Sequence, residues 1–417
     1  MSAAARLTTS VNRVSRRLGL GSGTVIGGRA GLKVAPDLVA RLAAGRPVAL
    51  VSGTNGKTTT TRLLVAALAE AGPVVTNATG SNMPAGHAAA LAAGDRDCPV
   101  VLEVDEGYLP ATLATTHPQA VILLNLSRDQ LDRTNEVRML AGRWREALAA
   151  APDVAVVANA DDPLVVWAAG RAARVTWVSA GLRWRSDAVG CPACEGRIEW
   201  RDEGWACACG FARPRPDVVL DDDGDDPTGC FADGERCTVR LALPGRFNRA
   251  NALSAVVAAE AMGVPRQTAL EAVAEVADVA GRFTTVEVGG VTTRLLLAKN
   301  PAGWAELFTL VAGETTPVVV AINARVADGK DPSWLFDVAF EELAGRVVVA
   351  TGDRARDLSV RLHYAEVDHE TVLEPVAAIA RAAALTRPPG GNGAAPDERH
   401  VDFIGNYTAF ADLVRQT

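Results

Sequence analysis

The segment Gly53–Thr60 (GTNGKTTT) constrains the fold of this chain more than any other feature of its sequence. It directly follows the apolar run Pro47–Ser52 and precedes a stretch with leucines at positions 63, 64 and 68. A glycine turn between a strand and a helix points backbone N–H groups at an anion, and the helix N-terminus adds partial positive charge. The sequence therefore predicts a phosphate-binding loop.

In such a loop the lysine and the next hydroxyl residue have separate tasks. We expect Lys57 to neutralise the β- and γ-phosphates of ATP and the Thr58 hydroxyl to reach the Mg²⁺ ion. The loop residues expected to contact the nucleotide are Gly53, Thr54, Asn55, Gly56, Lys57, Thr58 and Thr59.

Short apolar runs alternate with longer helix-like stretches along the chain. Four of these runs have the composition of buried strands, namely Pro47–Ser52, Val100–Val104, Ala120–Leu126 and Val154–Ala158. Buried strands that are each followed by a helix are typical of an α/β fold with a mainly parallel sheet. Farther along, Cys237–Pro244 is expected to form a strand, and Asn251–Met262 is expected to form a helix.

A length of 417 residues favours two or three domains. We expect an N-terminal segment, residues 1–45, to pack on an ATP-binding central domain, residues 46–280. A cysteine-rich insert, residues 184–216, interrupts that domain. Residues 281–417 are expected to form a second α/β domain, with strands at Val286–Leu297, Pro317–Asn323 and Arg346–Thr351.

The cysteine-rich insert offers two close pairs of thiols. Cys191 and Cys194 form a C-x-x-C pair, while Cys207 and Cys209 form a C-x-C pair. Zn²⁺ favours four tetrahedral sulfur ligands, and each pair can supply two of them. We expect a structural four-cysteine zinc ribbon, with free or redox-active thiols as the alternative.

Charge and hydropathy exclude some functions. The net charge of −7 argues against nucleic acid as a partner. The sequence has no run of 18 apolar residues, which argues against a membrane-spanning helix, and we expect a cytoplasmic protein.

The N-terminal segment is basic, with no acidic residue before Asp37. Leu7, Val11, Val14 and Leu18 recur at helical spacing beside four arginines. Two interpretations stay open: the apolar stripe packs onto the nucleotide-binding domain, or it contacts the anionic inner face of the plasma membrane.

The phosphate-binding loop departs from the general G-x-x-x-x-G-K-S/T pattern, because Val51 stands where the first glycine belongs. The form GTNGKTTT resembles the Mur ligase and folylpolyglutamate synthase superfamily. Further segments resemble that superfamily in the same order along the chain: LEVDE at 102–106, NLSRDQLD at 125–132, NADDP at 159–163, GRFN at 245–248 with Asn251, and Gly281-Arg282.

The resemblance implies roles for residues outside the loop. Glu103 is the position that matches the superfamily's Mg²⁺-coordinating glutamate, with Glu106 as the alternative, and Asn251 is expected to touch the nucleotide. Gln130 replaces the superfamily's histidine, so a second metal site is expected to be altered or missing. No lysine lies between Lys57 and Lys299, so the carbamylated lysine of the amino-acid-adding ligases has no counterpart in its usual place.

Segments of the C-terminal part resemble the MurT family of Mur-ligase-type subunits. They are KNPAG at 299–303, ADGKDPSW at 327–334, TGDR at 351–354 and NYTA at 406–409. The resemblance implies amidation of the α-carboxyl of D-glutamate in the stem peptide of lipid II, through an acyl phosphate and with ammonia from a GatD-type glutaminase subunit. In that family an aspartate completes the catalytic triad of the partner. Asp331 matches it, with Asp328 and Asp337 as alternatives.

Two other functions compete with this one. An amino-acid-adding ligase, including a folylpolyglutamate-synthase type, is disfavoured by the missing lysine. A zinc-ribbon ATPase that binds nucleic acid is disfavoured by the net charge and by the acidic run 221–226.

Overall fold

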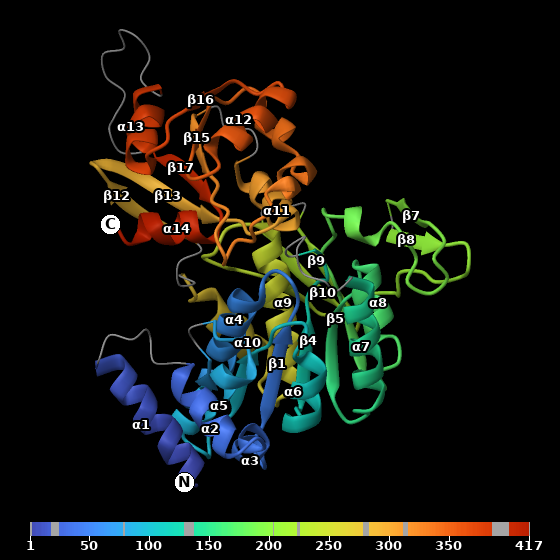
Figure 1. Cartoon of the computed structure of the whole chain (residues 1–417). Coiled ribbons are helices and arrows are strands. Elements are labelled where there is room, and N and C mark those ends of the chain that lie inside the picture. The colour runs from blue at the N-terminus through green and yellow to red at the C-terminus, as the bar shows by residue number, and fades with distance from the viewer. Residues whose placement is uncertain are drawn as a thin grey trace. The chain divides into compact units, whose positions relative to one another are not determined.

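The structure is a computed structural model that describes residues 2–17, 25–77, 80–128, 137–202, 204–222, 226–277, 283–311, 316–385 and 400–416. Gln130 and the rest of the 129–132 segment, Gly281-Arg282, and residues 223–225 of the acidic run 221–226 lie outside these residues. The chain divides into two compact units (Figure 1). Unit 1 comprises Met1–Ser127 and Asn135–Ala277, and unit 2 comprises Arg128–Thr134 and Asp278–Thr417.

Unit 1 is built on a nine-stranded sheet with the order β11-β10-β9-β6-β5-β4-β1-β3-β2. Each pair of neighbouring strands from β2 to β9 is parallel, whereas β10 is antiparallel to both of its neighbours, β9 and β11. The strands are β1 (Val48–Ser52), β2 (Val75–Thr76), β3 (Val100–Glu103), β4 (Ala120–Leu123), β5 (Ala155–Asn159), β6 (Val175–Ser179), β9 (Val218–Asp221), β10 (Thr228–Phe231) and β11 (Arg236–Thr238). A separate hairpin joins β7 (Ile198–Arg201) to β8 (Gly204–Cys207).

Helices cover both faces of this sheet (Figure 1). Helices α4, α9 and α10 pack together, and α7 packs against α6 and α8. The helices of unit 1 are α1 (Ala3–Arg17), α2 (Ile26–Val34), α3 (Leu38–Ala43), α4 (Lys57–Ala69), α5 (Pro84–Ala93), α6 (Leu109–Thr116), α7 (Val137–Ala149), α8 (Pro163–Ala169), η1 (Ser186–Ala188), α9 (Arg246–Ala261) and α10 (Arg266–Ala274).

The predicted α/β fold with a parallel sheet is confirmed. Every residue of β1, β3 and β4 is buried, as expected for parallel strands covered on both faces. The four predicted buried strands agree with β1, β3, β4 and β5 to within a few residues. The expected strand Cys237–Pro244 is largely wrong, since β11 ends at Thr238 and the chain continues as a turn into α9.

The N-terminal helix forms where its apolar spacing predicts it, but of its apolar stripe Leu7 and Val14 are exposed and Val11 is half-buried, while Leu18 lies outside the described residues. Its buried residues are Ala4, Ala5, Thr8, Asn12 and Ser15. Small residues face one another here because α2 approaches closely: a Cβ atom on Gly27 would lie 2.2 Å from the Thr8 carbonyl oxygen. The Asn12 side chain accepts a hydrogen bond from the Gly27 N–H at 2.7 Å, so the buried amide oxygen is satisfied.

Unit 2 contains a six-stranded sheet with the order β12-β13-β17-β14-β15-β16, in which only β12 is antiparallel to its neighbour. Its strands are β12 (Phe283–Val288), β13 (Val291–Leu297), β14 (Val318–Ala321), β15 (Val348–Thr351), β16 (His369–Thr371) and β17 (Val401–Gly405). Its helices are α11 (Pro301–Val311), η2 (Ser333–Asp337), η3 (Phe340–Leu343), α12 (Ala355–Tyr364), α13 (Pro375–Leu385) and α14 (Tyr407–Val414).

The single strand expected over Val286–Leu297 is instead a hairpin. Gly289 and Gly290 both adopt positive φ, at 56° and 79°, which allows a two-residue turn between β12 and β13. Among the described residues, no helix combines the length and the apolar character needed to cross a bilayer.

Candidate nucleotide and metal sites

The predicted phosphate-binding loop connects β1 to α4. Gly53 and Gly56 have φ values of 145° and 85°, which side chains rarely tolerate. A Cβ atom on Gly53 would lie 2.9 Å from the Leu124 Cβ, and one on Gly56 would lie 2.9 Å from the Asn251 Oδ1. Both positions therefore require glycine, and Asn251 of α9 lies directly beside the loop.

Asn125, after β4, holds the loop in place. Its side-chain oxygen accepts a hydrogen bond from the Asn55 N–H at 2.9 Å, and its amide nitrogen donates to the Asn55 carbonyl at 3.0 Å. The Thr54 N–H donates to the Asn125 carbonyl, and the Thr54 hydroxyl donates to the Ser127 carbonyl at 3.0 Å. These bonds fix the backbone that would face a phosphate. Sequence reasoning gave Asn125 no role, although its NLSRDQLD segment marked the position.

Two acidic residues meet the loop, Glu103 at the end of β3 and Glu106 in the segment that follows it. The Thr58 hydroxyl donates a hydrogen bond to the Glu103 Oε2 at 2.9 Å. Lys57 Nζ lies 3.1 Å from the Glu106 Oε2 and also donates to the carbonyls of Gly53 and Thr54. The structure thus brings both predicted alternatives, Glu103 and Glu106, to the loop, but it gives them different partners.

These contacts distinguish the two glutamates chemically. The Thr58 hydroxyl and the Glu103 carboxylate supply adjacent oxygen atoms, which are the ligands that a hard divalent cation such as Mg²⁺ prefers. Glu106 pairs with a cationic side chain, and both members of that pair are mostly buried. The oxygen set at Thr58 and Glu103 therefore fits a divalent cation better than Glu106 does.

The NADDP turn after β5 supports the same edge of the sheet. Asp162 caps α8 by accepting from the Leu164 N–H, and it also accepts from the Leu126 N–H at 2.8 Å. Burial raises the pKa of Asp162 to about 6. Asp161 accepts from Arg213 Nε at 2.8 Å and from the N–H groups of Ala180 and Gly181. Both aspartates have structural partners, and the sequence match alone did not reveal these roles.

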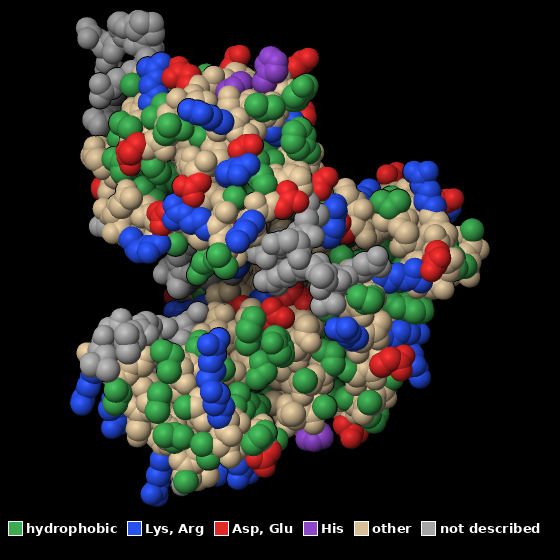
Figure 2. All heavy atoms as spheres, in the orientation of Figure 1, with side chains coloured by type: hydrophobic (Ala, Val, Ile, Leu, Met, Phe, Trp, Pro, Cys, Tyr) green, Lys and Arg blue, Asp and Glu red, His purple; other side chains and the backbone are tan. Residues whose placement is uncertain are grey.

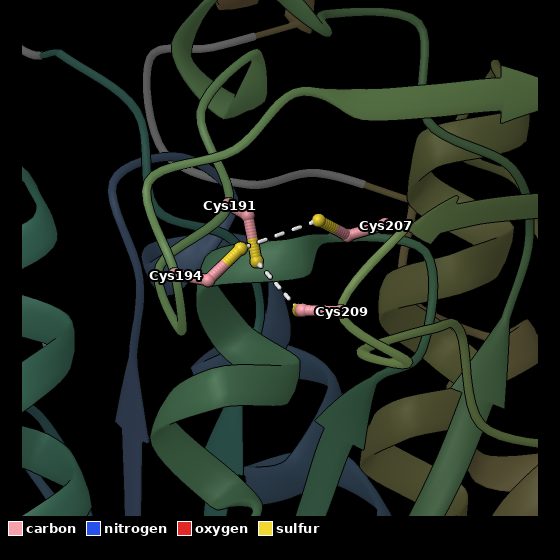
Figure 3. Close-up of side chains that lie close together, drawn as sticks. All are labelled: Cys191, Cys194, Cys207 and Cys209. Carbon is pink, nitrogen blue, oxygen red and sulfur yellow. Dashed lines mark hydrogen bonds between the residues drawn. The ribbon is translucent and has the colours of Figure 1, made fainter.

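The four predicted metal-ligating cysteines come together in space (Figure 3). Their sulfur atoms all lie within 4.8 Å of one another, with 3.8 Å between Cys191 and Cys209 and 3.5 Å between Cys194 and Cys207. A tetrahedral zinc site with Zn–S bonds of about 2.3 Å implies sulfur separations of about 3.8 Å. A hydrogen bond from the Phe211 backbone lowers the pKa of Cys209 to about 7. The geometry suits a single thiolate-bound metal ion.

The three candidate aspartates of unit 2 differ in exposure and in partners. Asp328 is buried and accepts hydrogen bonds from the N–H and the hydroxyl of Thr408. Asp337 is exposed and forms an ion pair with Arg128 at 3.4 Å. Asp331 is exposed and accepts from the Ser333 N–H at 2.9 Å, and this hydrogen bond lowers its pKa. Asp331 is thus an exposed, ionised carboxylate on a loop, whereas Asp328 holds that loop in place.

Comparison with known families gives two matches along the chain. The Mur ligase middle domain matches residues 51–188, and the MurT ligase C-terminal domain matches residues 297–410. The chain is 29% identical to the protein of Staphylococcus aureus strain COL named lipid II isoglutaminyl synthase (glutamine-hydrolyzing) subunit MurT, over 99% of this chain and 97% of that protein. It is 28% identical to the Streptococcus pneumoniae protein of the same name, over 85% of each.

Solved structures support the same fold. A pseudomurein peptide ligase type C from Methanothermus fervidus superimposes with a TM-score of 0.66 at 19% identity, over 91% of this chain and 80% of that one. MurF from Acinetobacter baumannii superimposes with a TM-score of 0.66 at 17% identity, over 93% and 80% of the two chains. The fold and the full-length similarity agree: the chain has the Mur ligase fold, and it resembles proteins named as MurT subunits over nearly its whole length.

Proposed function

We propose that this chain is the synthetase subunit of a glutamine-dependent amidotransferase that converts the α-carboxyl of D-glutamate in the lipid II stem peptide into an amide. The observation that carries the proposal is the contact of Thr58 with Glu103 beside Lys57, in a chain similar to MurT over nearly its whole length. That arrangement suits ATP-dependent activation of a carboxylate.

The reaction needs activation because a carboxylate does not react with ammonia directly. The substrate carboxylate oxygen attacks the γ-phosphorus of ATP, the bond to the bridging oxygen of ADP breaks, and an acyl phosphate forms. Ammonia then attacks the acyl carbon, phosphate leaves, and the nitrogen loses a proton to give the amide. Lys57 stabilises the negative charge on the transferring phosphoryl group. Mg²⁺, held by Thr58 and Glu103, supplies further charge neutralisation when it is bound.

The ammonia comes from a separate GatD-type glutaminase, so the working enzyme is a complex. The four clustered cysteines have the arrangement of a metal site, and Cys98 is buried, so none of these thiols is suited to replace the nucleophile of a glutaminase. We propose that Asp331 reaches the partner and orients the histidine of its catalytic triad, as an aspartate does in serine hydrolases. Its exposure and ionised state suit that role.

Reconstitution tests this function. Purified chain, a GatD-type glutaminase, ATP, Mg²⁺ and glutamine should convert a lipid II stem peptide from the acid to the amide, as read by mass spectrometry. Ammonium should replace glutamine and glutaminase, but nothing should replace ATP. ATP-dependent addition of a free amino acid, with no amidation from either nitrogen source, would instead support the amino-acid-adding ligase.

We propose that the cysteine cluster binds one Zn²⁺ per chain and that this ion stabilises the β7–β8 hairpin. Metal-binding energy is folding energy in such small modules. We expect Cys191→Ser or Cys207→Ser to lose the zinc and expose the hairpin to proteolysis, whereas Cys230→Ser, outside the cluster, should keep it. Elemental analysis that finds no zinc in the wild-type protein, with all four thiols readily alkylated, would contradict the assignment.

We also propose that α1 contacts the anionic inner face of the plasma membrane. The helix packs on α2 through its small and polar face, which leaves Leu7 and Val14 exposed at 38% and 53%. Arg6, Arg13, Arg16 and Arg17 are exposed as well, and Figure 2 shows blue side chains projecting from this region. Six cationic and no acidic residues precede Asp37 in a chain of net charge −7, so the charge complements anionic lipid.

Vesicle sedimentation tests the membrane contact. The full chain should bind phosphatidylglycerol vesicles more strongly than phosphatidylcholine vesicles, and added salt should weaken the binding. Replacing both Leu7 and Val14 by serine should reduce binding, because two inserted side chains are lost. Val326→Ser, at an exposed site on unit 2, serves as the matched control. Equal binding to both lipids, or no effect of the α1 substitutions, would remove this proposal.

A further inference from the structure

Strand β3, which ends at Glu103, extends beyond the end of β2, its neighbour on one side. β3 pairs with β1 along its whole length, up to the register pair Val51 and Glu103. On its other side, β2 pairs only through Val75 with Val100 and through Thr76 with Val101. β2 ends at Thr76, so no strand residue is available to bond the backbone N–H and C=O of Glu103 on that side. Glu103 is buried, and unmet backbone groups there would be costly.

The side chain of Asn77 takes the place of the missing strand. Its Oδ1 accepts a hydrogen bond from the Glu103 N–H at 2.9 Å, and its Nδ2 donates to the Glu103 carbonyl oxygen at 2.9 Å. The same nitrogen donates to the Ser81 carbonyl at 3.1 Å, so both amide hydrogens are used. A carboxamide presents the same donor and acceptor as a peptide group. Asn77 therefore adds one more pair of sheet-like hydrogen bonds to β3. These bonds are made at Glu103, the residue whose carboxylate meets the Thr58 hydroxyl.

His87 of α5 adds a second bond to the same carbonyl. Its Nε2 lies 2.9 Å from the Glu103 carbonyl oxygen, and the imidazole is fully buried. A carbonyl oxygen only accepts, so Nε2 must carry the proton and donate. The Glu103 N–H and C=O are thus held by Asn77 and His87, while on the β1 side the bond is made by the next residue, Val104, whose N–H donates to the Val51 carbonyl.

We propose that Asn77 and His87 are positioning residues that fix Glu103 for the divalent cation of Mg²⁺·ATP. This inference rests on the proposed ATP-dependent function. The described hydrogen bonds of both side chains to Glu103 go to its backbone and leave its carboxylate to Thr58. With the backbone fixed, only the side-chain torsions of Glu103 stay free, and the carboxylate is held ready beside the loop. Groups that orient a metal ligand typically change metal affinity or activity by about 10–100-fold.

Binding of Mn²⁺ in the presence of ATP, followed by electron paramagnetic resonance, tests the proposal without measuring turnover. In Asn77→Ala the affinity for Mn²⁺ should fall about tenfold or more. Binding of ATP in excess chelator should stay near the wild-type value, because the loop and Lys57 are unchanged. In the amidation assay, the Mg²⁺ concentration for half-maximal rate should rise, and saturating Mg²⁺ should restore most of kcat.

Two further substitutions separate positioning from general damage. Asn12 is another buried asparagine whose amide oxygen bonds a backbone N–H, but it lies on α1, so Asn12→Ala should leave Mn²⁺ binding unchanged. His87→Gln keeps an N–H donor and should bind Mn²⁺ more tightly than His87→Leu, which has none. The histidine pair keeps the test available even if Asn77→Ala fails to fold.

Specific outcomes overturn the inference. Wild-type Mn²⁺ affinity in folded Asn77→Ala, or equal affinities in the two His87 variants, would show that these side chains do not position Glu103. If instead the wild-type chain itself binds neither ATP nor Mn²⁺ with ATP, the proposed function fails. The two failures are therefore distinguishable.

Discussion

Replacing Lys57 by alanine should lower the rate of amidation by about 10²–10³-fold or more, because a preorganised charge at the transferring phosphoryl group is lost. The loss should appear with glutamine and with ammonium alike, since the acyl phosphate precedes both. Amidation of the stem peptide in the reconstituted complex measures the effect. Thr58→Ala should behave similarly, because it removes the hydroxyl that meets Glu103.

The Lys57→Ala experiment needs a control for stability, because Lys57 is also one half of an ion pair. Lys57 and Glu106 form a mostly buried ion pair, so removing the lysine alone leaves a carboxylate without its cation and destabilises the fold. The double variant Lys57→Ala/Glu106→Gln removes that charge and should restore thermal stability without restoring amidation. Arg62→Ala, an exposed cation on the same helix, should keep near wild-type activity. Wild-type rates in folded Lys57→Ala would refute the role of the loop.

Replacing Asp331 by asparagine should cut glutamine hydrolysis by the complex by about 10⁴-fold, the loss seen when the aspartate of a serine-protease triad becomes asparagine. The carboxylate orients the histidine and stabilises its protonated form, which an amide cannot do. Complex formation and ATP binding should stay largely intact, since Asp331 is exposed and its only described hydrogen bond is to Ser333 of its own loop. Glutamate release measures the glutaminase activity directly.

Free ammonium gives the sharper version of this test. It bypasses glutamine hydrolysis, so it should restore amidation in Asp331→Asn but not in Lys57→Ala. Asp337→Asn, which alters an exposed aspartate nearby in sequence, is the matched control and should hydrolyse glutamine normally. Asp328→Asn should instead loosen the loop, because it weakens the contacts to Thr408. If ammonium fails to rescue Asp331→Asn, the residue acts in ATP-dependent synthesis and its triad role is wrong.

Much of the fold follows from local sequence features. Buried parallel strands need continuous apolar runs, so Val100–Val104 and Ala120–Leu126 were recognisable without any tertiary information. The loop Gly53–Thr60 was equally clear, because its positive-φ glycines and its strand and helix neighbours lie within one short segment. The cysteine cluster also assembled as expected, since each close pair is local and one hairpin brings the two pairs together.

Other features depend on which elements meet, and the sequence alone left them open. Spacing showed that Leu7 and Val14 share one side of a helix, but it could not show that α2 offers glycines to the opposite side. Packing against Gly27 and Gly31 favours a small side chain at Thr8, because small side chains allow the closest approach. The turn at Gly289-Gly290 is a different case, because a Gly-Gly pair between two strand-like runs is a local hairpin signal that the expectation of a single strand overlooked.

The sequence by itself determined the α/β fold class, the glycine-containing loop between β1 and α4, and the thiol cluster, because each depends on residues close together in the chain. The tertiary structure alone distinguished Glu103, which meets the Thr58 hydroxyl, from Glu106, which pairs with Lys57. It alone placed Asn77 against the backbone of Glu103. These contacts join strands and loops separated by 26 to 49 positions, and only the order of the strands in the sheet brings them within hydrogen-bonding distance.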